Sequence, residues 1–338
     1  MNGVDLARFD FDYDNTWQAF FLDADLNVYG RYGGREASAP EARLSKESLV
    51  QTMGEVLAAF ERRKKNPAGP TDDLEVHPAP AQSKKPADFP LLKANHSGCV
   101  HCHQVQEFRL LQSFADGAFD KQLLFPFPLP ENIGLRFDRD HGHRVKEVLP
   151  ESPASRAGVK VGDIVARAEN VPIRSEDDFR WSLHRLRDQS EIAIQVTRES
   201  VQEPVALNLS LPAGWRKGDI SWRKSLRSYP VVWGFLGYPV GQEERKTTDI
   251  PEHALAIKVV SLRGQSGGIA RALGLQKGDV IVSIEDNTRA RTLEQFKSEL
   301  LGRYGPGDTM RLRIRRGTET IELTGEFPDW FTSDRTVP

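Results

Sequence analysis

A short stretch of the sequence gathers the side chains that could do chemistry. The segment KANHSGCVHCHQVQEF holds both cysteines of the chain, Cys99 and Cys102, and three of its eight histidines, His96 and His103 among them. Thiolate and imidazole groups at this density can hold a haem or a zinc ion, or two thiols can form a redox-active disulfide. The spacing of these residues indicates which of the three kinds of site is favoured.

The order Cys-x-x-Cys-His in this segment resembles the attachment motif of c-type haem. On one helical turn, the sulfurs of Cys99 and Cys102 can each add to a haem vinyl group, and His103 then lies under the iron as the proximal ligand. Apolar side chains follow the motif at helical intervals, at Val105, Phe108, Leu111 and Phe114. We therefore expect the motif to open an amphipathic helix, and the resemblance implies covalently bound haem c.

Alternative interpretations of the same residues remain open. A zinc ion could take its ligands from Cys99, Cys102 and either His96 or His103, although a second close pair of ligands is absent and the site would have to be completed from elsewhere. A thioredoxin-type redox pair needs an apolar strand before the first cysteine, and PLLKANHSG is a poor strand. The two cysteines could also have no role in chemistry.

The composition narrows the classes of protein. The chain has 338 residues, so two or three domains are expected, and its net charge of −2 gives no field of one sign that would favour nucleic acid. No apolar run approaches the roughly 18 residues of a membrane span. The start, MNGVDLARFDFDYD, shows no export signal.

The N-terminal part, residues 1–65, predicts a hairpin followed by a helix. Strands are expected at Trp17 to Leu22 and Val28 to Tyr32, joined by the turn DADLN. The helix spans LSKESLVQTMGEVLAAFERRKK, with Ser45 as its N-cap. Its apolar residues at helical spacing are Leu49, Met53, Val56, Leu57 and Phe60. Residues 66–90 are rich in proline, alanine and charge, and they predict a linker.

The second half of the chain contains an internal repeat. SPASRAGVKVGDIVARAENVPI is echoed by SGGIARALGLQKGDVIVSIEDNTR, and each copy continues into a helix and an alternating strand. The repeat resembles the PDZ domain in its bacterial arrangement, through Gly162-Asp163 in the first copy and Gly278-Asp279 in the second. The resemblance implies two PDZ domains, at residues 130–212 and 233–328, which are joined by a linker at 213–232 and followed by a tail at 329–338.

PDZ domains bind extended peptides or protein C-termini at a sheet edge, where backbone N–H groups bind the terminal carboxylate. By resemblance, the peptide-binding loops are NIGLRF and GFLGY, with the residues Ile133, Gly134 and Leu135 in the first copy and Phe235, Leu236 and Gly237 in the second. Both depart from the common Gly-Leu-Gly-apolar order. A polar insertion, GQEERKTTDIPEH, follows the second loop, so we expect the first groove to be the functional one.

The sequence RGQSGG resembles the nucleophile region of chymotrypsin-like serine proteases. Its serine, Ser266, takes the place that Ser152 has in the first copy, at the opening of a PDZ helix. No protease domain of roughly two hundred residues is present to supply the base and the acid. We therefore expect no hydrolase activity.

The N-terminal hairpin and helix resemble the second half of a thioredoxin-like fold and are too small for a core of their own. This segment is either a cap on the PDZ pair or part of a longer exported protein. Covalent haem implies a periplasmic or otherwise extracytoplasmic location, whereas a chain complete as given would be cytoplasmic. In that case zinc becomes the better interpretation.

The sequence thus predicts an α+β multidomain protein. A thioredoxin-like βα fragment, a linker and a small helical CxxCH segment (residues 91–129) precede two PDZ-like β-sandwich or barrel domains. The favoured function is a c-type haem protein that transfers electrons to a redox partner or senses redox state, and that docks protein partners by peptide recognition. The alternative is a PDZ scaffold, or an accessory protein of a protease or redox system, with zinc at the CxxCH site.

Overall fold

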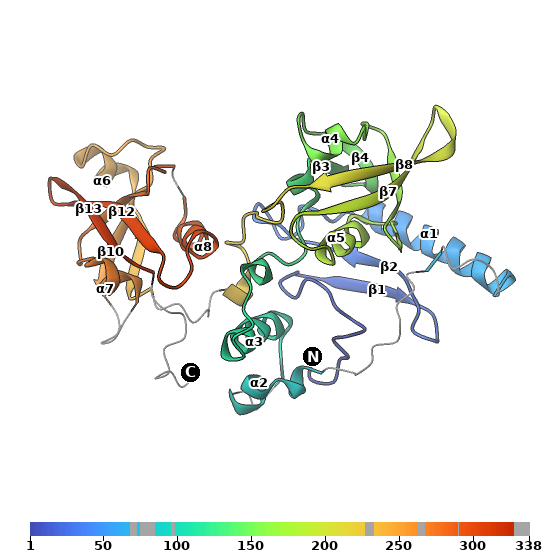
Figure 1. Cartoon of the computed structure of the whole chain (residues 1–338), viewed down its shortest axis with the longest axis horizontal. Helices are drawn as coiled ribbons and strands as arrows, with labels where there is room; N and C mark the ends of the chain where they lie inside the picture. Colours follow the sequence, from blue (N-terminus) through green and yellow to red (C-terminus); the bar gives the residue numbers. More distant parts are fainter. Residues whose placement is uncertain are drawn as a thin grey trace. The chain divides into compact units, whose positions relative to one another are not determined.

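The computed structural model describes the chain except for residues 68–72, 75–84, 96–98, 227–232, 263–267, 290 and 328–338. The chain divides into two compact units. One of the points at which the chain passes from the first unit to the second, between Phe108 and Arg109, lies within the helix Cys102–Ala115. The first unit comprises Met1–Phe108 and Asp120–Gly218, and the second comprises Arg109–Phe119 and Asp219–Pro338. The structure is α+β, with antiparallel pairing in each sheet (Figure 1).

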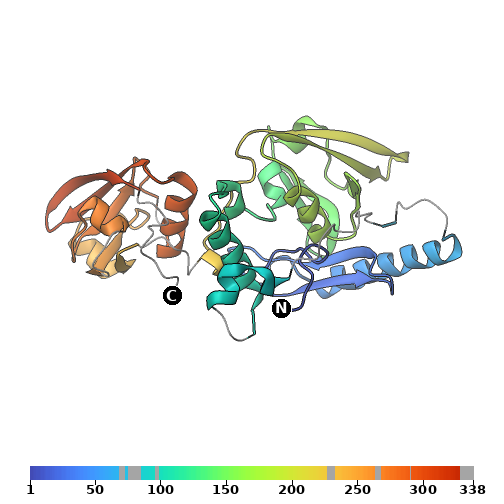
Figure 2. The ribbon, with the colours of Figure 1, turned by 60° about the horizontal axis from the view of Figure 1, so that its bottom comes forward.

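The expected N-terminal hairpin and helix are both present. Strand β1 (Gln18–Leu22) pairs antiparallel with β2 (Val28–Gly33), and the carboxylate of Asp23 accepts backbone N–H bonds within the turn. Helix α1 (Lys46–Lys65) begins after Ser45, whose side chain accepts the N–H of Ser48. Figure 2 shows the hairpin running alongside α1. We call residues 1–65 the N-terminal cover.

The buried face of α1 differs from the expected one. Met53 and Leu57 are 51% and 60% exposed, whereas Ser48, Thr52 and Ala59 are buried. Polar partners explain the difference, because the Thr52 hydroxyl donates to the carbonyl of Arg174 at 3.0 Å and the Ser48 hydroxyl lies 2.7 Å from that of Tyr32. Hydrogen bonds to Arg174 and Tyr32 turn the small face of α1 inward and leave Met53 and Leu57 exposed, while Val56 packs against Tyr29 and Ala59.

The main sheet of the first unit has the strand order β3-β4-β5-β7-β8, with β6 paired to β5. Its strands are β3 (Leu135–Asp138), β4 (His141–Val148), β5 (Ile164–Ala168), β6 (Val171–Pro172), β7 (Ser190–Arg198) and β8 (Val201–Leu211). Its helices are α4 (Pro153–Arg156) and α5 (Glu176–His184), with the 3-10 turns η2 (Lys121–Leu124) and η3 (Pro130–Ile133) ahead of the sheet. One apolar core joins β3, α5 and the segment before η3.

The sheet of the second unit repeats this order as β9-β10-β11-β12-β13. Its strands are β9 (Phe235–Pro239), β10 (Ile257–Leu262), β11 (Val280–Ile284), β12 (Thr309–Arg316) and β13 (Glu319–Glu326). The helices of this part are α6 (Gln242–Thr247), α7 (Ile269–Leu273) and α8 (Leu293–Arg303), after the 3-10 turn η4 (Lys224–Leu226). The insertion expected after the second loop thus contains α6.

The Gly-Asp turns of the two units match atom by atom. The N–H of Gly162 donates to the carbonyl of Val145 at 2.8 Å, and the N–H of Val145 donates to the carbonyl of Asp163 at 2.8 Å. The second unit repeats both bonds at the same length with Gly278, Val259 and Asp279. Both glycines have a positive φ, of 90° and 97°, which a residue without a Cβ adopts at little cost. The repeat is therefore structural.

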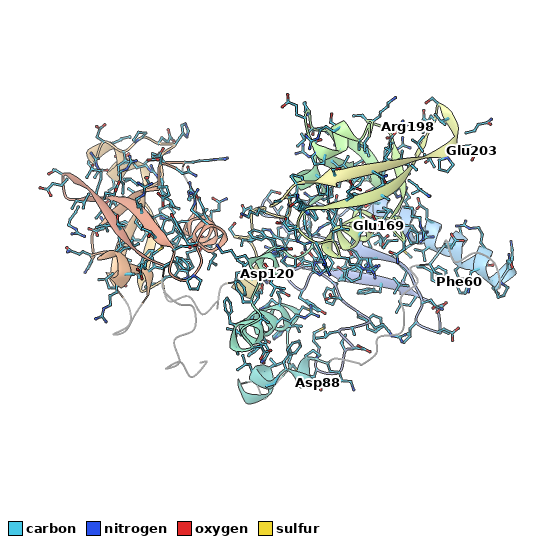
Figure 3. The ribbon with its side chains drawn as sticks, viewed as in Figure 1. Phe60, Asp88, Asp120, Glu169, Arg198 and Glu203 are labelled. Carbon is cyan, nitrogen blue, oxygen red and sulfur yellow. The ribbon has the colours of Figure 1, made fainter. Side chains whose placement is uncertain are left out.

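Each of these aspartates is also held by an arginine from a later strand. Arg198, labelled in Figure 3 at the end of β7, donates to both carboxylate oxygens of Asp163 at 2.7 and 2.9 Å. Arg316 donates to both oxygens of Asp279 at 2.8 and 2.9 Å. These bidentate pairs tie the start of the central strand to the sheet.

Two of the expected boundaries need correction. Part of the expected linker at 213–232 is packed, since Trp215, Arg216 and Trp222 are buried. Arg216 donates to the carbonyl of Leu183 at 3.2 Å and to that of Leu186 at 2.7 Å, at and just beyond the end of α5. Residues 1–65 and 130–212 also belong to one compact unit rather than to separate domains.

The expected linker at 66–90 lies largely outside the described residues. Within it, Asp73 pairs with Arg62 and Arg174, and Leu74 is buried against Tyr29 and Ala59. The short elements η1 (Pro86–Asp88), α2 (Pro90–Asn95) and α3 (Cys102–Ala115) follow. Among the residues that the structure describes, no helix is long and apolar enough to cross a membrane.

Candidate peptide grooves and the Cys-His segment

The first candidate groove starts at a glycine that ends η3. Gly134 has φ 86°, its N–H donates to the carbonyl of Glu131, and its carbonyl accepts from Leu149. A Cβ on Gly134 would overlap the side chain of Ser152. The neighbouring residues Ile133 and Leu135 are fully buried in the core. The structure therefore places all three predicted residues of this loop together, ahead of β3.

The second candidate loop lies two residues earlier than the sequence suggested. Gly234 has φ 71° and directly precedes β9, as Gly134 precedes β3. A Cβ on Gly234 would press against Ala270, at the start of α7. Gly237, the glycine chosen from the sequence, lies within β9 and does not have a positive φ. The equivalent of Ile133-Gly134-Leu135 is thus Trp233-Gly234-Phe235, with Phe235 shared between the two assignments.

The helix that faces the first groove is buried on all sides. Every residue of α5 from Asp177 to Leu183 is buried, which is typical of a helix that has a neighbour on each face. Phe179 and Leu183 face the sheet core. Figures 1 and 2 show β1 and β2 lying along α5, and the backbone N–H of Arg31 in β2 donates to Asp178 at 2.8 Å.

The N-terminal cover places a carboxylate against α5. Arg180 is fully buried and donates to Asp12 at 2.9 Å, and Asp12 is itself buried. The same guanidinium donates to the carbonyl of Phe127 at 3.0 Å. The ring of Phe127 stacks on His184 with a centroid distance of 4.1 Å. An internal aspartate and an internal aromatic residue therefore occupy this side of α5.

Arg43 of the cover connects the two walls of the first groove. Its guanidinium pairs with Glu131, before β3, at 2.9 Å, and with Glu176, the first residue of α5. It also pairs with Glu36 at 2.6 Å. Burial lowers the pKa of Arg43, but the three carboxylates outweigh burial and hold the pKa above its usual range. The cover thus ties the segment before β3 to the start of α5, the two elements that flank the groove that the sequence favoured.

The second groove lacks such a cover among the described residues. In α8, Phe296, Leu300 and Leu301 are buried, while the remaining residues are at least partly accessible. Strand β9 is the edge of its sheet, with β10 as its neighbour. Its side chains Leu236 and Tyr238 are 39% and 47% exposed. An edge strand that carries exposed apolar side chains invites pairing with another chain.

A lysine lies at the loop end of this second groove. The ammonium of Lys297, in α8, lies 5.5 Å from the ring centroid of Trp233, the residue before Gly234. Burial lowers the pKa of Lys297, and Glu294 opposes this shift. In the described part of the chain, no carboxylate lies within ion-pair distance of Lys297.

The Cys-His segment forms the start of α3. Cys99 is exposed, and Cys102 is half-buried at the first position of the helix. The helix predicted after the motif is present. Asn2 accepts the N–H of Val100 at 2.9 Å, so the N-terminus holds the backbone between the cysteines.

The zinc interpretation of this segment stays a prediction. In the described parts of the chain, which include Cys99, Cys102 and His103, no three His, Cys, Asp or Glu side chains lie together as metal ligands would. His96 lies outside the described residues, as does Ser266 of the protease-like sequence.

One family model matches the chain, and its description is "PDZ domain". It covers residues 132–209, from the loop before β3 into β8. The chain contains a PDZ domain. This match confirms the first copy of the expected pair, and the second copy is supported by its identical strand order and turn hydrogen bonds.

The chain is related to periplasmic serine endoproteases of the DegP type. A DegP-like protein of Pseudomonas savastanoi is 29% identical over 196 residues, which are 57% of this chain and 39% of that protein. DegP of Escherichia coli is 24% identical over 189 residues, which are 56% of this chain and 35% of DegP. The chain thus spans about two fifths or less of the length of these relatives, and the relationship is distant.

Solved structures of HtrA-type proteins also resemble the chain. The HtrA-type protease AlgW with a decapeptide shares 19% identity, with 40% of each chain covered and a TM-score of 0.24. The PDZ domain of HtrA3 bound to a phage-derived ligand shares 20% identity, with 28% of this chain and 82% of that chain covered and a TM-score of 0.22.

Sequence reasoning missed three residues that shape the grooves. Lys297 stands in an ordinary-looking helix, and only its alignment with Arg180 in the repeat could have drawn attention to it. Gly234 could have been found by matching WGF to IGL across the two copies. Asp12 carried no signal, because its partner Arg180 is far away in the sequence.

Proposed function

We propose that this chain docks extended segments of partner proteins in the groove between β9 and α8 of the second unit. The contrast between the two helices carries the proposal, since α5 is buried on all sides while α8 keeps an accessible outer face. A peptide strand would add to the edge of β9 through backbone hydrogen bonds. Leu236 and Tyr238 would contact alternate side chains of that added strand.

The relationship to DegP-type proteases supports peptide docking as the activity of the PDZ region. The AlgW and HtrA3 structures named above contain a decapeptide and a phage-derived ligand, respectively. The catalytic activity of the relatives is not part of this proposal. The names of the relatives favour a periplasmic location.

Selection of peptides by the purified chain tests the proposal. The probe is a random nonapeptide library in two formats, one with free C-termini and one with both ends fused to a carrier protein. We expect ligands to be enriched and to shift the amide NMR signals of Leu236, Gly237 and Tyr238. No enrichment in either format, or shifts confined to β3, would overturn the proposal.

A matched pair of variants locates the groove. Leu236 and Arg136 follow the two loop glycines at the same distance, and both side chains are exposed. We expect Leu236→Glu to weaken binding of the selected peptides at least about tenfold. Arg136→Glu should leave their binding unchanged, because the proposal places the peptide in the second groove.

We propose covalent haem c on Cys99 and Cys102, with His103 as the proximal ligand, as a second candidate function. It is supported by the start of α3 at Cys102 and by the accessibility of both thiols. The two sulfurs and the imidazole follow the order of the attachment motif, with Cys102 and His103 at the start of α3 and Cys99 in the segment before it. When bound, the haem would supply one-electron redox chemistry, and its covalent attachment would place the protein outside the cytoplasm.

Expression in a host with cytochrome c maturation machinery tests this candidate. We expect haem that stays with the chain after denaturation and that disappears in Cys99→Ala/Cys102→Ala. His101→Ala is the matched control, because His101 lies between the cysteines and should not be needed. Stoichiometric zinc without covalent haem would replace haem by the zinc alternative.

A further inference from the structure

The two units place a basic residue at the same position of their groove helices. Ser175 and Thr292 cap α5 and α8 with their side chains. Arg180 and Lys297 each come five residues after these caps. The fully buried residues Phe179 and Leu183 correspond to Phe296 and Leu300, which are also fully buried. The equivalence of the two cations therefore rests on the helix caps and on the core.

In the first unit, this position already has a carboxylate partner. The Asp12 carboxylate lies 2.9 Å from the Arg180 guanidinium, and both groups are buried. Asp12 lies within the chain, between the turn at Asp5–Phe9 and β1. The carboxylate is therefore an aspartate side chain and not a chain terminus. The Asp12–Arg180 pair is thus an example, within this chain, of an aspartate side chain that pairs with a cation on the helix beside a groove.

In the second unit, Lys297 occupies the position of Arg180, and no carboxylate corresponds to Asp12 among the described residues. Lys297 contacts the ring of Trp233 at 5.5 Å, and it has no carboxylate partner within the described ranges. The lowered pKa of Lys297 reflects a partly desolvated ammonium group. Such a group gains from an added anion, because the pair is screened less there than in bulk water.

We infer that the second groove recognises an extended segment with an internal aspartate or glutamate, whose carboxylate pairs with Lys297. The inference rests on the proposed docking function and adds the chemical class of the ligand. Trp233 fixes the lysine beside Gly234, so the acidic residue would lie near the start of β9. Asp12 and Arg180 are the intramolecular counterpart of this pair.

The fused-end nonapeptide library tests the inference, because its peptides offer no free terminal carboxylate. Selections run in parallel on the wild-type chain and on Lys297→Gln. We expect the wild type to enrich aspartate or glutamate at one fixed position, and the variant to lose this preference while still enriching ligands. Changing the selected acid to its amide should weaken wild-type binding about fivefold to tenfold, which is about 1 kcal/mol.

The controls separate this pair from the general charge of the protein. Lys277→Gln removes an exposed lysine from the turn before Gly278 and should leave both preference and affinity unchanged. In Lys297→Glu, we expect the selected peptides to carry lysine or arginine at the position where the wild type selects an acidic residue.

Each outcome bears on one of the two proposals. Wild-type ligands without an acidic preference, or an equal preference in Lys297→Gln, would overturn the inference and leave the docking proposal standing. Failure of both chains to enrich any ligand in either library format would overturn the docking proposal itself. An acid preference that persists in Lys297→Gln but disappears in Arg136→Glu would assign the ligand to the first groove and reject the inference.

Discussion

The interface between the N-terminal cover and α5 is rich in buried charge, and Asp178 is one of its carboxyl groups with a raised pKa. Asp178 accepts the backbone N–H groups of Arg31 at 2.8 Å and of Arg174 at 3.1 Å. Burial raises its pKa to about 7, although the guanidinium groups of the same two arginines oppose the shift, and Asp177 adds to it. Folding therefore favours the protonated form of this group.

The sign of the pH dependence follows from that shift. The unfolded pKa is about 3.9, so the folded state binds the proton more tightly, and the stabilisation is complete below that pH. It is lost as the pH rises through about 7. We expect the melting temperature to fall between pH of about 5 and about 8, and to fall less in Asp178→Asn. Equal slopes in the two proteins would show that Asp178 is ionised throughout this range.

At Gly134, the loop glycine before β3, the addition of a single Cβ atom should change the free energy of unfolding. In Gly134→Ala, the new methyl group would combine a positive φ of 86° with overlap on Ser152. We expect a loss of about 2–4 kcal/mol in the free energy of unfolding, measured by urea denaturation. Gly158→Ala is the control, since its φ is 84° but open space surrounds it. It should lose only about 1–2 kcal/mol, and similar losses in both would refute the role of Ser152.

Element by element, the ion pair between Asp12 and Arg180 holds the cover on α5. Asp12→Ala would remove the carboxylate partner of the buried Arg180 guanidinium and leave its hydrogen bond to the carbonyl of Phe127, at 3.0 Å. We expect a loss of about 3–5 kcal/mol, because an unpaired buried charge is costly. The double variant Asp12→Ala/Arg180→Leu should recover much of it in urea denaturation.

A surface pair supplies the control for that experiment. Lys246 and Glu243 are 73% and 90% exposed, so Lys246→Ala should change stability by less than about 1 kcal/mol. If Asp12→Ala behaves like Lys246→Ala, the cover is held by its apolar contacts instead.

The start of a helix or strand was predictable from the sequence where a single capping residue or a single turn determines it. Ser45 identified the start of α1, and the Gly-Asp pairs identified the starts of β5 and β11. The packing of these elements was not predictable in the same way. Met53 and Leu57 belong to the apolar line of α1, yet they are exposed, because hydrogen bonds of Thr52 to Arg174 and of Ser48 to Tyr32 turn a different face inward.

The choice between the two grooves was beyond sequence reasoning for a related reason. The insertion after the second loop suggested a closed groove, but it contains α6 and leaves β9 at the sheet edge. In the first unit, α5 is held to the cover by Arg43 and Asp12, whose partners Glu176 and Arg180 lie far away in the sequence. Long-range ion pairs leave no periodic pattern in a sequence. The thioredoxin-like interpretation of the hairpin stays a hypothesis.

At the scale of the whole molecule, two domains of one topology have different surroundings. The first is combined with residues from the N-terminus into one unit, in which α5 is buried, whereas α8 of the second keeps an accessible face. Relatives of the DegP type share this region but extend well beyond it. Peptide docking by the second domain and a redox role of the CxxCH segment can be tested independently, because they depend on different residues.

The burial of α5 on all sides also has a consequence for how freely the sequence can vary. Residues from Asp177 to Leu183 should tolerate substitution as poorly as a hydrophobic core, even though four of the seven are polar or charged. The outward positions of α8, such as Glu294 and Ser298, should accept most amino acids. A saturation library of both helices, sorted for folded protein by protease resistance, would measure this difference. Comparable tolerance in the two helices would mean that the cover is dispensable, whereas the expected asymmetry would show that one copy of the repeat has lost its freedom to diversify while the other has kept it.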